Sequence, residues 1–262
     1  MVRWASFWLV SALTGSACAQ SVTPGVTEAL EIVRGHVERL ETSVPNFICD
    51  EQIVSRLYLN QKVKKETRAQ AVLTTTRTVE GGTFTESRAE MRINGKPTKR
   101  TDISGPFVWK GGPAYADLHY LFNSPHASEC RSYQLTGGVK LESKDTLFLQ
   151  AHANPGQGEM CRDLPETSVD KVWLEPASLN VLRIESVNPP TTRDSDPLDG
   201  GTLTLMVEYA PVVFDNAEYW LPSHFISRID YVGSPRHYVY ESFFSNYHKY
   251  GAESVIHIDP NQ

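Results

Sequence analysis

The 262-residue chain lacks the short motifs that mark the common catalytic sites. It has no His-Glu-x-x-His pair, no Gly-x-Ser-x-Gly elbow, no phosphate-binding loop and no dinucleotide fingerprint. Its eight histidines are scattered, and their neighbours in sequence supply neither a metal pair nor a nucleophile with its base. The sequence therefore predicts a protein that is not an enzyme, with no catalytic residue and no cofactor.

Metal-ligand spacing is also missing. One loop gathers three carboxylates, Asp194, Asp196 and Asp199, which is the ligand type that calcium prefers. The third Asp comes one residue late for an EF-hand, and Leu205 stands where the bidentate Glu would fall. We expect a solvated hairpin loop there and no metal site.

Positive charge is in deficit, because 25 Lys and Arg stand against 31 Asp and Glu, a net charge of −6. Nucleic acid is therefore excluded as an expected partner, since phosphate binding needs a basic surface. The nearest approach to a basic patch consists of Lys62, Lys64, Lys65 and Arg68, followed by Lys96, Lys99 and Arg100. We interpret these residues as a solvated turn and two hairpin ends.

Long apolar runs are absent after the first twenty residues, so no transmembrane segment is expected in the mature chain. The N-terminal run follows Arg3, is too short to span a bilayer, and ends in Ala17-Cys18-Ala19, a small-x-small cleavage pattern. These features predict a signal peptide over residues 1–19 and a periplasmic or secreted protein. The alternative is a lipoprotein anchored through Cys18; it is less favoured because the large aliphatic Leu13 lies five positions before the cysteine instead of three.

Cysteine is scarce, and three cysteines remain after signal removal: Cys49, Cys130 and Cys161. Outside the cytosol thiols tend to pair, and an odd number leaves one over. Turn signals at Gly137-Gly138 and at residues 154–158 lie between the second and third, so antiparallel strands can bring these two together. We predict a Cys130–Cys161 disulfide and a buried, free Cys49.

One amphipathic helix is predicted over residues 26–44. Its apolar residues recur at spacings of three and four: Val26, Leu30, Val33, Val37, Leu40 and Val44. A second, short helix is predicted between Pro113 and Ser124, where the period changes again. Each helix has one apolar side, which we expect to pack against the rest of the protein.

Nearly everything else has the alternation and turn chemistry of strands. Candidate strands cover residues 47–59, 68–79, 83–94, 130–136, 139–151, 169–175, 180–187, 202–210, 217–231, 236–248 and 252–258. Short connections between successive strands favour an antiparallel meander. The pattern therefore predicts one domain over residues 20–262, mainly β with two helices, in which so many strands must curl into a barrel or split into a sandwich.

Aromatic and large aliphatic residues crowd the region around the second helix. The candidates for lining a ligand cavity are Phe107, Trp109, Leu118, Leu121 and Phe122. In a curled sheet such residues either line a cavity for an apolar ligand or pack the core, and core packing is the commoner role.

Several segments together resemble a known group of proteins. They are Val44-Pro45-Asn46-Phe47-Ile48-Cys49-Asp50, Gly105-Pro106-Phe107, Leu121-Phe122, Val172-Trp173-Leu174, Val181-Leu182-Arg183-Ile184, Tyr219-Trp220-Leu221-Pro222 and Phe244-Ser245-Asn246-Tyr247-His248-Lys249-Tyr250. The chain resembles uncharacterised exported proteins of soil acidobacteria, whose strand order is similar to the LolA/LolB-like lipoprotein carriers. The resemblance implies a strongly curved antiparallel sheet, an incomplete β-barrel wrapped around helices, with an apolar hollow that receives acyl chains in the carriers. No ligand-contacting residue of the carriers matches a specific position here.

The expected function is that of a non-catalytic carrier or binding protein for an apolar or acylated ligand, with a lipid or a lipoprotein as the partner. A structural or protein-interaction module of the cell envelope is the alternative. A hydrolase whose acid–base groups converge only in the fold is less favoured. The sequence does not set the oligomeric state.

Overall fold

The computed structural model describes residues 24–77, 84–99, 116–154, 156, 161, 168–189 and 201–251. Several expectations lie outside these residues: the signal peptide, Phe107 and Trp109, the acidic loop, and the strand at 252–258. None of the described helices is both long and apolar enough to cross a bilayer.

Three helices and eleven strands make up the described structure. The helices are α1 (Val26–Ser43), α2 (Ala116–Phe122) and α3 (Pro125–Glu129). The strands are β1 (Phe47–Leu59), β2 (Lys62–Arg77), β3 (Phe84–Ile93), β4 (Lys96–Pro97), β5 (Arg131–Leu141), β6 (Lys144–Ala153), β7 (Val169–Leu174), β8 (Val181–Asn188), β9 (Gly201–Phe214), β10 (Ala217–Tyr231) and β11 (Arg236–Lys249).

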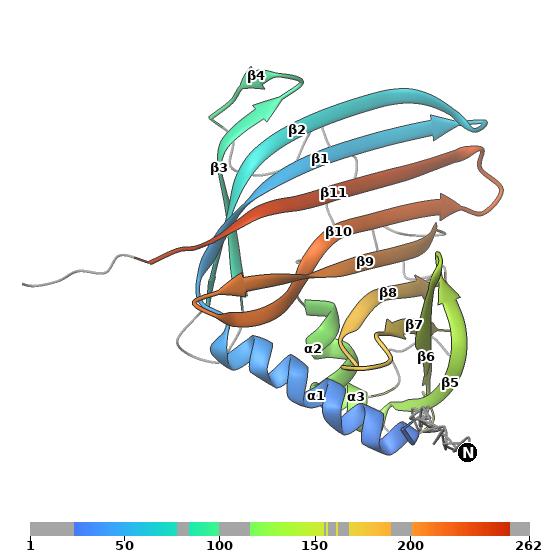
Figure 1. Cartoon of the computed structure of the whole chain (residues 1–262). Coiled ribbons are helices and arrows are strands. Elements are labelled where there is room, and N and C mark those ends of the chain that lie inside the picture. The colour runs from blue at the N-terminus through green and yellow to red at the C-terminus, as the bar shows by residue number, and fades with distance from the viewer. Residues whose placement is uncertain are drawn as a thin grey trace, which may run out of the picture.

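All the strands form one sheet in the order β4-β3-β2-β1-β11-β10-β9-β8-β7-β6-β5. The pairings are antiparallel, and all except β1 with β11 join strands that are neighbours in sequence. The sheet is strongly curved, and β4 and β5 form its two edges (Figure 1). The mainly-β, curved antiparallel fold class expected from the sequence is thus confirmed.

The pairing of β1 with β11 joins the two ends of the meander. Phe47 lies opposite Lys249 and Leu59 lies opposite Arg236, so the two strands run side by side over nearly their whole length. Beyond the strands, the Tyr250 amide donates to the Asn46 carbonyl at 2.7 Å. The hairpin units β1–β4 and β5–β10 are therefore held in one sheet by β11.

Helix α1 lies along the open side of the curved sheet, with α2 and α3 behind it (Figure 1). Val33, Val37 and Leu40 of the predicted apolar stripe are buried, together with Ala29, whereas Val26 and Leu30 of the stripe are partly buried. The buried residues of α1 belong to the same core cluster as residues of α2 and of the strands. Because a helix of this kind gains most of its stability from packing its apolar face, α1 and the concave face of the sheet stabilise each other.

Two sequence expectations about local structure were wrong. Gly137-Gly138 was expected to be a turn, but β5 continues through it, and Glu142 and Ser143 form the turn instead. Thr136 pairs with Phe148 and Val139 with Thr146, so β5 carries one extra residue and bulges at the glycines. The second error is the number of helices, because a third, α3, follows α2 directly.

Candidate functional site

The described ligand candidates lie on α2 and face the core. Leu118, Leu121 and Phe122 are at most 4% exposed and belong to the core cluster shared by α1 and the sheet. The other two candidates, Phe107 and Trp109, lie outside the described residues. The structure therefore brings three of the five together, on one short helix that shares its core cluster with α1.

Polar contacts hold α2 against α1. The Glu41 carboxylate accepts from Asn123 Nδ2 at 3.3 Å and lies 2.7 Å from His119 Nδ1. The Arg34 Nε donates to the Phe122 carbonyl oxygen at 3.1 Å. A seven-residue helix is not stable alone, so these contacts and its buried side chains keep α2 in place.

A pocket of about 30 Å³ lies where α1 and α2 meet the sheet. Leu40 and Leu118 line it from the helices, and Tyr209 and Trp220 from the strands. A volume of this size holds a water molecule, whereas ligand pockets measure several hundred cubic ångströms. An acyl chain would therefore enter beside Leu118 only if α2 moved.

A buried charge cluster occupies another part of the concave face. Glu51 is 1% exposed and pairs with Arg88 through two contacts, Nε to Oε2 at 2.6 Å and Nη2 to Oε1 at 2.9 Å. The Ser242 hydroxyl donates to Glu51 at 2.8 Å, and the Tyr240 hydroxyl lies 3.4 Å from that of Ser242. Such a pair is tolerated away from water because its hydrogen bonds satisfy both ions.

Burial shifts the acid–base behaviour of the neighbouring groups. Desolvation raises the pKa of Glu86; the Arg88 charge opposes this shift, and the Glu51 charge adds to it. Burial, together with the Glu51 charge, also raises the pKa of the Cys49 thiol to about 12. Cys49 is buried and forms no disulfide, which confirms the prediction. Because its thiol stays protonated at neutral pH, it is a poor nucleophile.

Hydroxyl groups line the concave face beside this cluster. Ser227, Tyr240, Ser55 and Thr67 are register neighbours across β10, β11, β1 and β2, and all are buried. Residues directly opposite each other on antiparallel strands share one face. The Oγ of Ser227 is fully buried and has no hydrogen-bond partner in the structure, which is uncommon for a buried hydroxyl. The concave face thus changes from apolar beside the helices to polar at this end.

Sequence reasoning missed the polar part of the concave face. The alternation of β1 contained a signal, because Glu51 and Ser55 occupy the same buried phase as Phe47, Cys49 and Ile53. A Glu in the apolar phase of a strand indicates a partner, since an unpaired buried carboxylate is costly. The partner itself, Arg88, lies two strands away and follows only from the register.

His224 lies on the opposite, outer face of the sheet, since it pairs with Phe243 whereas Glu51 pairs with Phe244. Its Nδ1 is 3.0 Å from Glu208 and its Nε2 is 3.1 Å from Glu241. A general base needs a ring nitrogen free to face a nucleophile, but both nitrogens here face carboxylates. His224, Glu208 and Glu241 therefore link β10 to β9 and β11 across the outer face, and their arrangement gives no support for a hydrolase.

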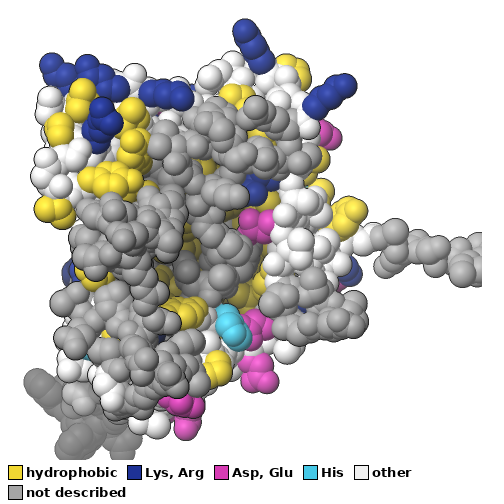
Figure 2. Space-filling view, turned by 180° about the vertical axis from the view of Figure 1, so that it is seen from behind, with side chains coloured by type: hydrophobic (Ala, Val, Ile, Leu, Met, Phe, Trp, Pro, Cys, Tyr) yellow, Lys and Arg dark blue, Asp and Glu magenta, His cyan; other side chains and the backbone are white. Residues whose placement is uncertain are grey.

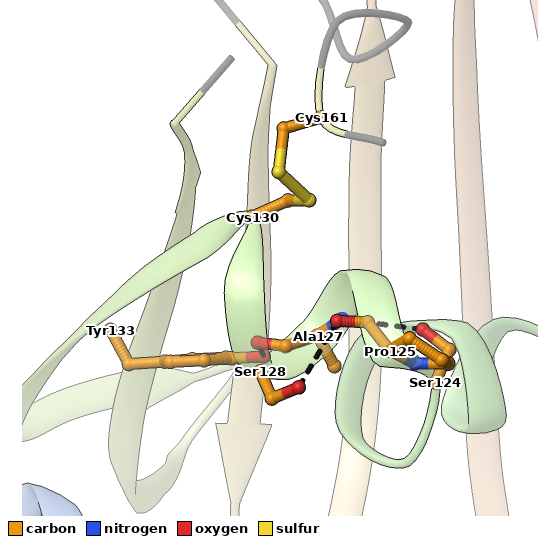
Figure 3. Close-up of a disulfide and its surroundings, with 7 residues drawn as sticks. All are labelled: Ser124, Pro125, Ala127, Ser128, Cys130, Tyr133 and Cys161. Carbon is orange, nitrogen blue, oxygen red and sulfur yellow. Dashed lines mark hydrogen bonds between the residues drawn. A yellow bond between two sulfur atoms is a disulfide. The ribbon is translucent and has the colours of Figure 1, made fainter. Parts of the chain in front are cut away.

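A disulfide fixes the segment that follows α2 (Figure 3). Cys130 and Cys161 are bonded, with their Cα atoms 5.2 Å apart, as the sequence predicted. Beside the bond, the Ala127 amide contacts Ser124 Oγ at 3.3 Å, and the Tyr133 hydroxyl donates to the Ala127 carbonyl at 3.1 Å. The disulfide thus ties the junction between α3 and β5 to a residue beyond β6.

No family model and no curated protein matches the chain. Among solved structures, the chain is similar to a DUF1329 family protein from Desulfovibrio piger (13% identity, TM-score 0.38, covering 86% of this chain and 92% of that one). It is also similar to a domain described as an outer membrane lipoprotein-sorting protein from Vibrio parahaemolyticus (14% identity, TM-score 0.42, covering 88% of this chain and 96% of that one). A LolA superfamily protein from Nitrosomonas europaea is similar as well (11% identity, TM-score 0.36, covering 86% of this chain and 94% of that one). At these identities and TM-scores we take neither family nor ligand from the likenesses.

Proposed function

We propose that the protein is an exported, non-catalytic carrier or binding protein for an acylated or otherwise apolar ligand, such as a lipid or a lipoprotein. The observation that carries the proposal is the two-part concave face, apolar around α1 and α2 and hydroxyl-lined around Ser227 and Tyr240. An amphiphile offers matching parts, an acyl chain for the apolar end and a polar head for the hydroxyl end.

Ligand entry in this proposal depends on α2. The helix has only seven residues, and its contacts with Glu41 and Arg34 lie at the partly exposed rim. Movement of α2 away from α1 would expose Leu118 and Leu121 and enlarge the water-sized pocket beside them. The candidates Phe107 and Trp109 remain part of the proposal as further lining residues.

Uptake of a fluorescent fatty acid by delipidated protein tests the proposal. We expect saturable binding by the native protein, and native mass spectrometry of protein purified from its own envelope should show a co-purifying lipid. Ser227→Ala is a suitable probe of the polar end, because its hydroxyl has no partner to lose and the fold should be unaffected. We expect weaker uptake in Ser227→Ala and unchanged uptake in Ser128→Ala, an exposed control on α3.

The apolar end is tested by a second matched pair. Leu118→Asp places a charge in the core beside α2, whereas Ile32→Asp makes the same change at an exposed site on α1. We expect loss of uptake only in the first, with circular dichroism confirming that both fold. A protein that is empty as purified and takes up no fatty acid after delipidation overturns the proposal.

Export is a separate part of the proposal. We propose removal of residues 1–19 and a mature chain that starts at Gln20 in the periplasm or outside the cell, with a lipid-anchored form through Cys18 as the alternative. N-terminal mass spectrometry of the exported protein distinguishes the two, because a diacylglyceryl group on Cys18 identifies the anchored form.

The alternative role as an envelope interaction module has weaker support. Exposed large apolar residues include Val213 and Val232, which are 63% and 78% exposed. They lie near the turns at opposite ends of β10, so they do not form one contiguous patch. Single exposed apolar residues of this kind are normal on a protein surface.

A further inference from the structure

The charge of the molecule is unevenly distributed. Residues 47–100, which span β1 to β4, carry eleven Lys and Arg against six Asp and Glu, a net charge of +5. The rest of the chain carries −11. Lys and Arg side chains gather along the upper edge of the molecule in Figure 2, the edge where Figure 1 places β1 to β4, while the visible Asp and Glu lie mostly lower.

A pocket opens on the outer face within this positive region. Its volume is about 240 Å³, and its lining includes Gln52, Arg68, Gln70, Arg92 and Asn94. Gln52, Gln70 and Arg92 pair directly across β1, β2 and β3, so their side chains share one face of the sheet. All five are exposed, and the pocket is therefore open to a ligand from solvent.

The turn between β3 and β4 fixes one wall of this pocket. Asn94 and Gly95 both adopt positive φ angles, 50° and 79°, as a two-residue Asn-Gly hairpin turn requires. The Arg68 amide donates to Asn94 Oδ1 at 3.0 Å, and the Asn94 amide donates to the Arg68 carbonyl at 2.8 Å. This wall of the pocket is thus held by one backbone and one side-chain hydrogen bond within the protein, independently of any ligand.

Two arginines and an amide at one pocket favour an anion. Guanidinium groups bind phosphate oxygens through paired hydrogen bonds, and an Asn side chain adds a neutral donor. Glu66 binds the Arg68 Nε at 2.6 Å, but the Arg68 side chain remains 65% exposed, so its outer donors can reach a ligand. Exposed lysines extend the positive region on both sides of the pocket: Lys62, Lys64, Lys65, Lys96 and Lys99.

We propose that this basic region is a membrane-docking surface, with the pocket between β1, β2 and β3 binding the phosphate of an anionic phospholipid headgroup. The acidic remainder of the molecule is repelled by the same bilayer, so the charge asymmetry also orients the protein with β1 to β4 towards the surface. The expectation that these residues form only a solvated turn and hairpin ends is replaced by a binding role. The proposal does not depend on the carrier function.

Flotation of the full mature protein with vesicles tests the docking surface. We expect binding to phosphatidylcholine vesicles that contain phosphatidylglycerol, little binding to phosphatidylcholine alone, and loss of binding in molar salt, where the Debye length is about 3 Å. The double variant Arg68→Gln/Arg92→Gln should bind roughly twenty-five-fold more weakly, since each basic residue near an anionic surface contributes about five-fold. Lys140→Gln/Lys144→Gln removes the same charge from the β5–β6 hairpin and should bind like the native protein.

Several results overturn the proposal. Equal binding to both vesicle types, or equal weakening in the two double variants, would show that the pocket does not direct docking. Saturable binding of glycerol phosphate without vesicle binding would assign the pocket to a soluble phosphate compound instead. Preferential binding of duplex DNA would assign the basic region to nucleic acid. Fatty-acid uptake, measured on the same variants, should be unchanged, so failure of docking is distinguishable from failure of the carrier proposal.

Discussion

At the scale of single residues, the stability of the fold should be especially sensitive to the buried pair of Glu51 and Arg88. Glu51 is 1% exposed, and Arg88 and Ser242 together supply its hydrogen bonds. Removal of Glu51 leaves Arg88 with only the Glu86 carboxylate, 3.7 Å away, and removal of Arg88 leaves two carboxylates without their cation. Stability should therefore respond far more strongly to this pair than to ion pairs at the surface.

Glu51→Gln should lower the free energy of unfolding by about 3 kcal/mol, because the buried Arg88 charge keeps only its longer, 3.7 Å contact with Glu86. Urea unfolding at neutral pH measures the change, provided that the slope of the transition stays constant. Asp145→Asn is the matched control, since Asp145 pairs with Lys140 at 2.7 Å and both side chains are more than half exposed. Its effect should stay below about 1 kcal/mol, and similar midpoints for the two variants would contradict the prediction.

The raised pKa of Glu86 predicts a pH dependence. Its folded-state pKa lies above the ordinary 4.5, so between these two values the folded state binds more protons than the unfolded state. Its contribution to stability therefore falls as the pH rises through that window. Glu86→Gln removes this loss, and the variant should gain stability relative to the native protein between pH 4.5 and neutrality. Unfolding midpoints measured at a series of pH values check this, and a relative gain by the native protein would be the opposite result.

At the scale of elements, two glycine-containing pairs show what local sequence does and does not determine. Asn94-Gly95 forms a hairpin turn, which this dipeptide favours, whereas Gly137-Gly138 was predicted to be a turn and is a bulge within β5. Gly138 has a φ of 72°, and a bulge satisfies that preference as well as a turn does. Only the pairing of β5 with β6 distinguishes the two, and this pairing is not visible in the local sequence.

The same glycine-to-alanine change should have opposite signs in β5 and α1. Gly138→Ala forces an L-residue into left-handed backbone and should cost about 1–2 kcal/mol. Gly35→Ala lies within α1, where a Cβ atom would meet nothing within 4 Å, and should stabilise the protein by about 0.5–1 kcal/mol. Thermal unfolding of both variants provides the measurement, and equal signs would show that the bulge at β5 is wrongly described.

The disulfide is the element-scale feature that the sequence predicted most specifically. Its closed loop spans 31 residues, so Cys130→Ala/Cys161→Ala should lower stability by about 3–4 kcal/mol. Non-reducing peptide mapping should find this link and a free Cys49. Because the pKa of Cys49 is about 12, its thiol should resist alkylation in the folded protein and react once the protein is unfolded. Rapid alkylation of the folded protein would contradict the burial of Cys49.

The sequence predicted most elements because each carries its own period or turn chemistry. The stripe of α1, the end of α2 at Phe122 and the Asn94-Gly95 turn all follow from neighbouring residues. The candidate site was less accessible, since it depends on side chains that meet across several strands. Glu51 and Arg88 are 37 residues apart, and their contact requires the registers of both β1–β2 and β2–β3, each with a bulge.

At the scale of the whole molecule, β11 connects the two halves of the sheet. It pairs with β1 on one side and β10 on the other, and no other described strand links these halves. A chain that ends before Arg236 should therefore fail to form the native sheet, whereas a chain that ends after Gly251 keeps the last described hydrogen bond and should fold. Near-ultraviolet circular dichroism of both truncated proteins checks this. Native-like spectra for the shorter one would show that the halves associate without β11.

The central position of β11 also sets the timing of folding. The contact between Glu51 and Ser242 closes a loop of 191 residues, and long-range pairing of this kind is intrinsically slow. A chain that emerges from a ribosome N-terminus first lacks the native partner of β1 on that side until β11, the last described strand, has appeared. The sheet therefore stays incomplete until nearly all of the described chain is available for pairing.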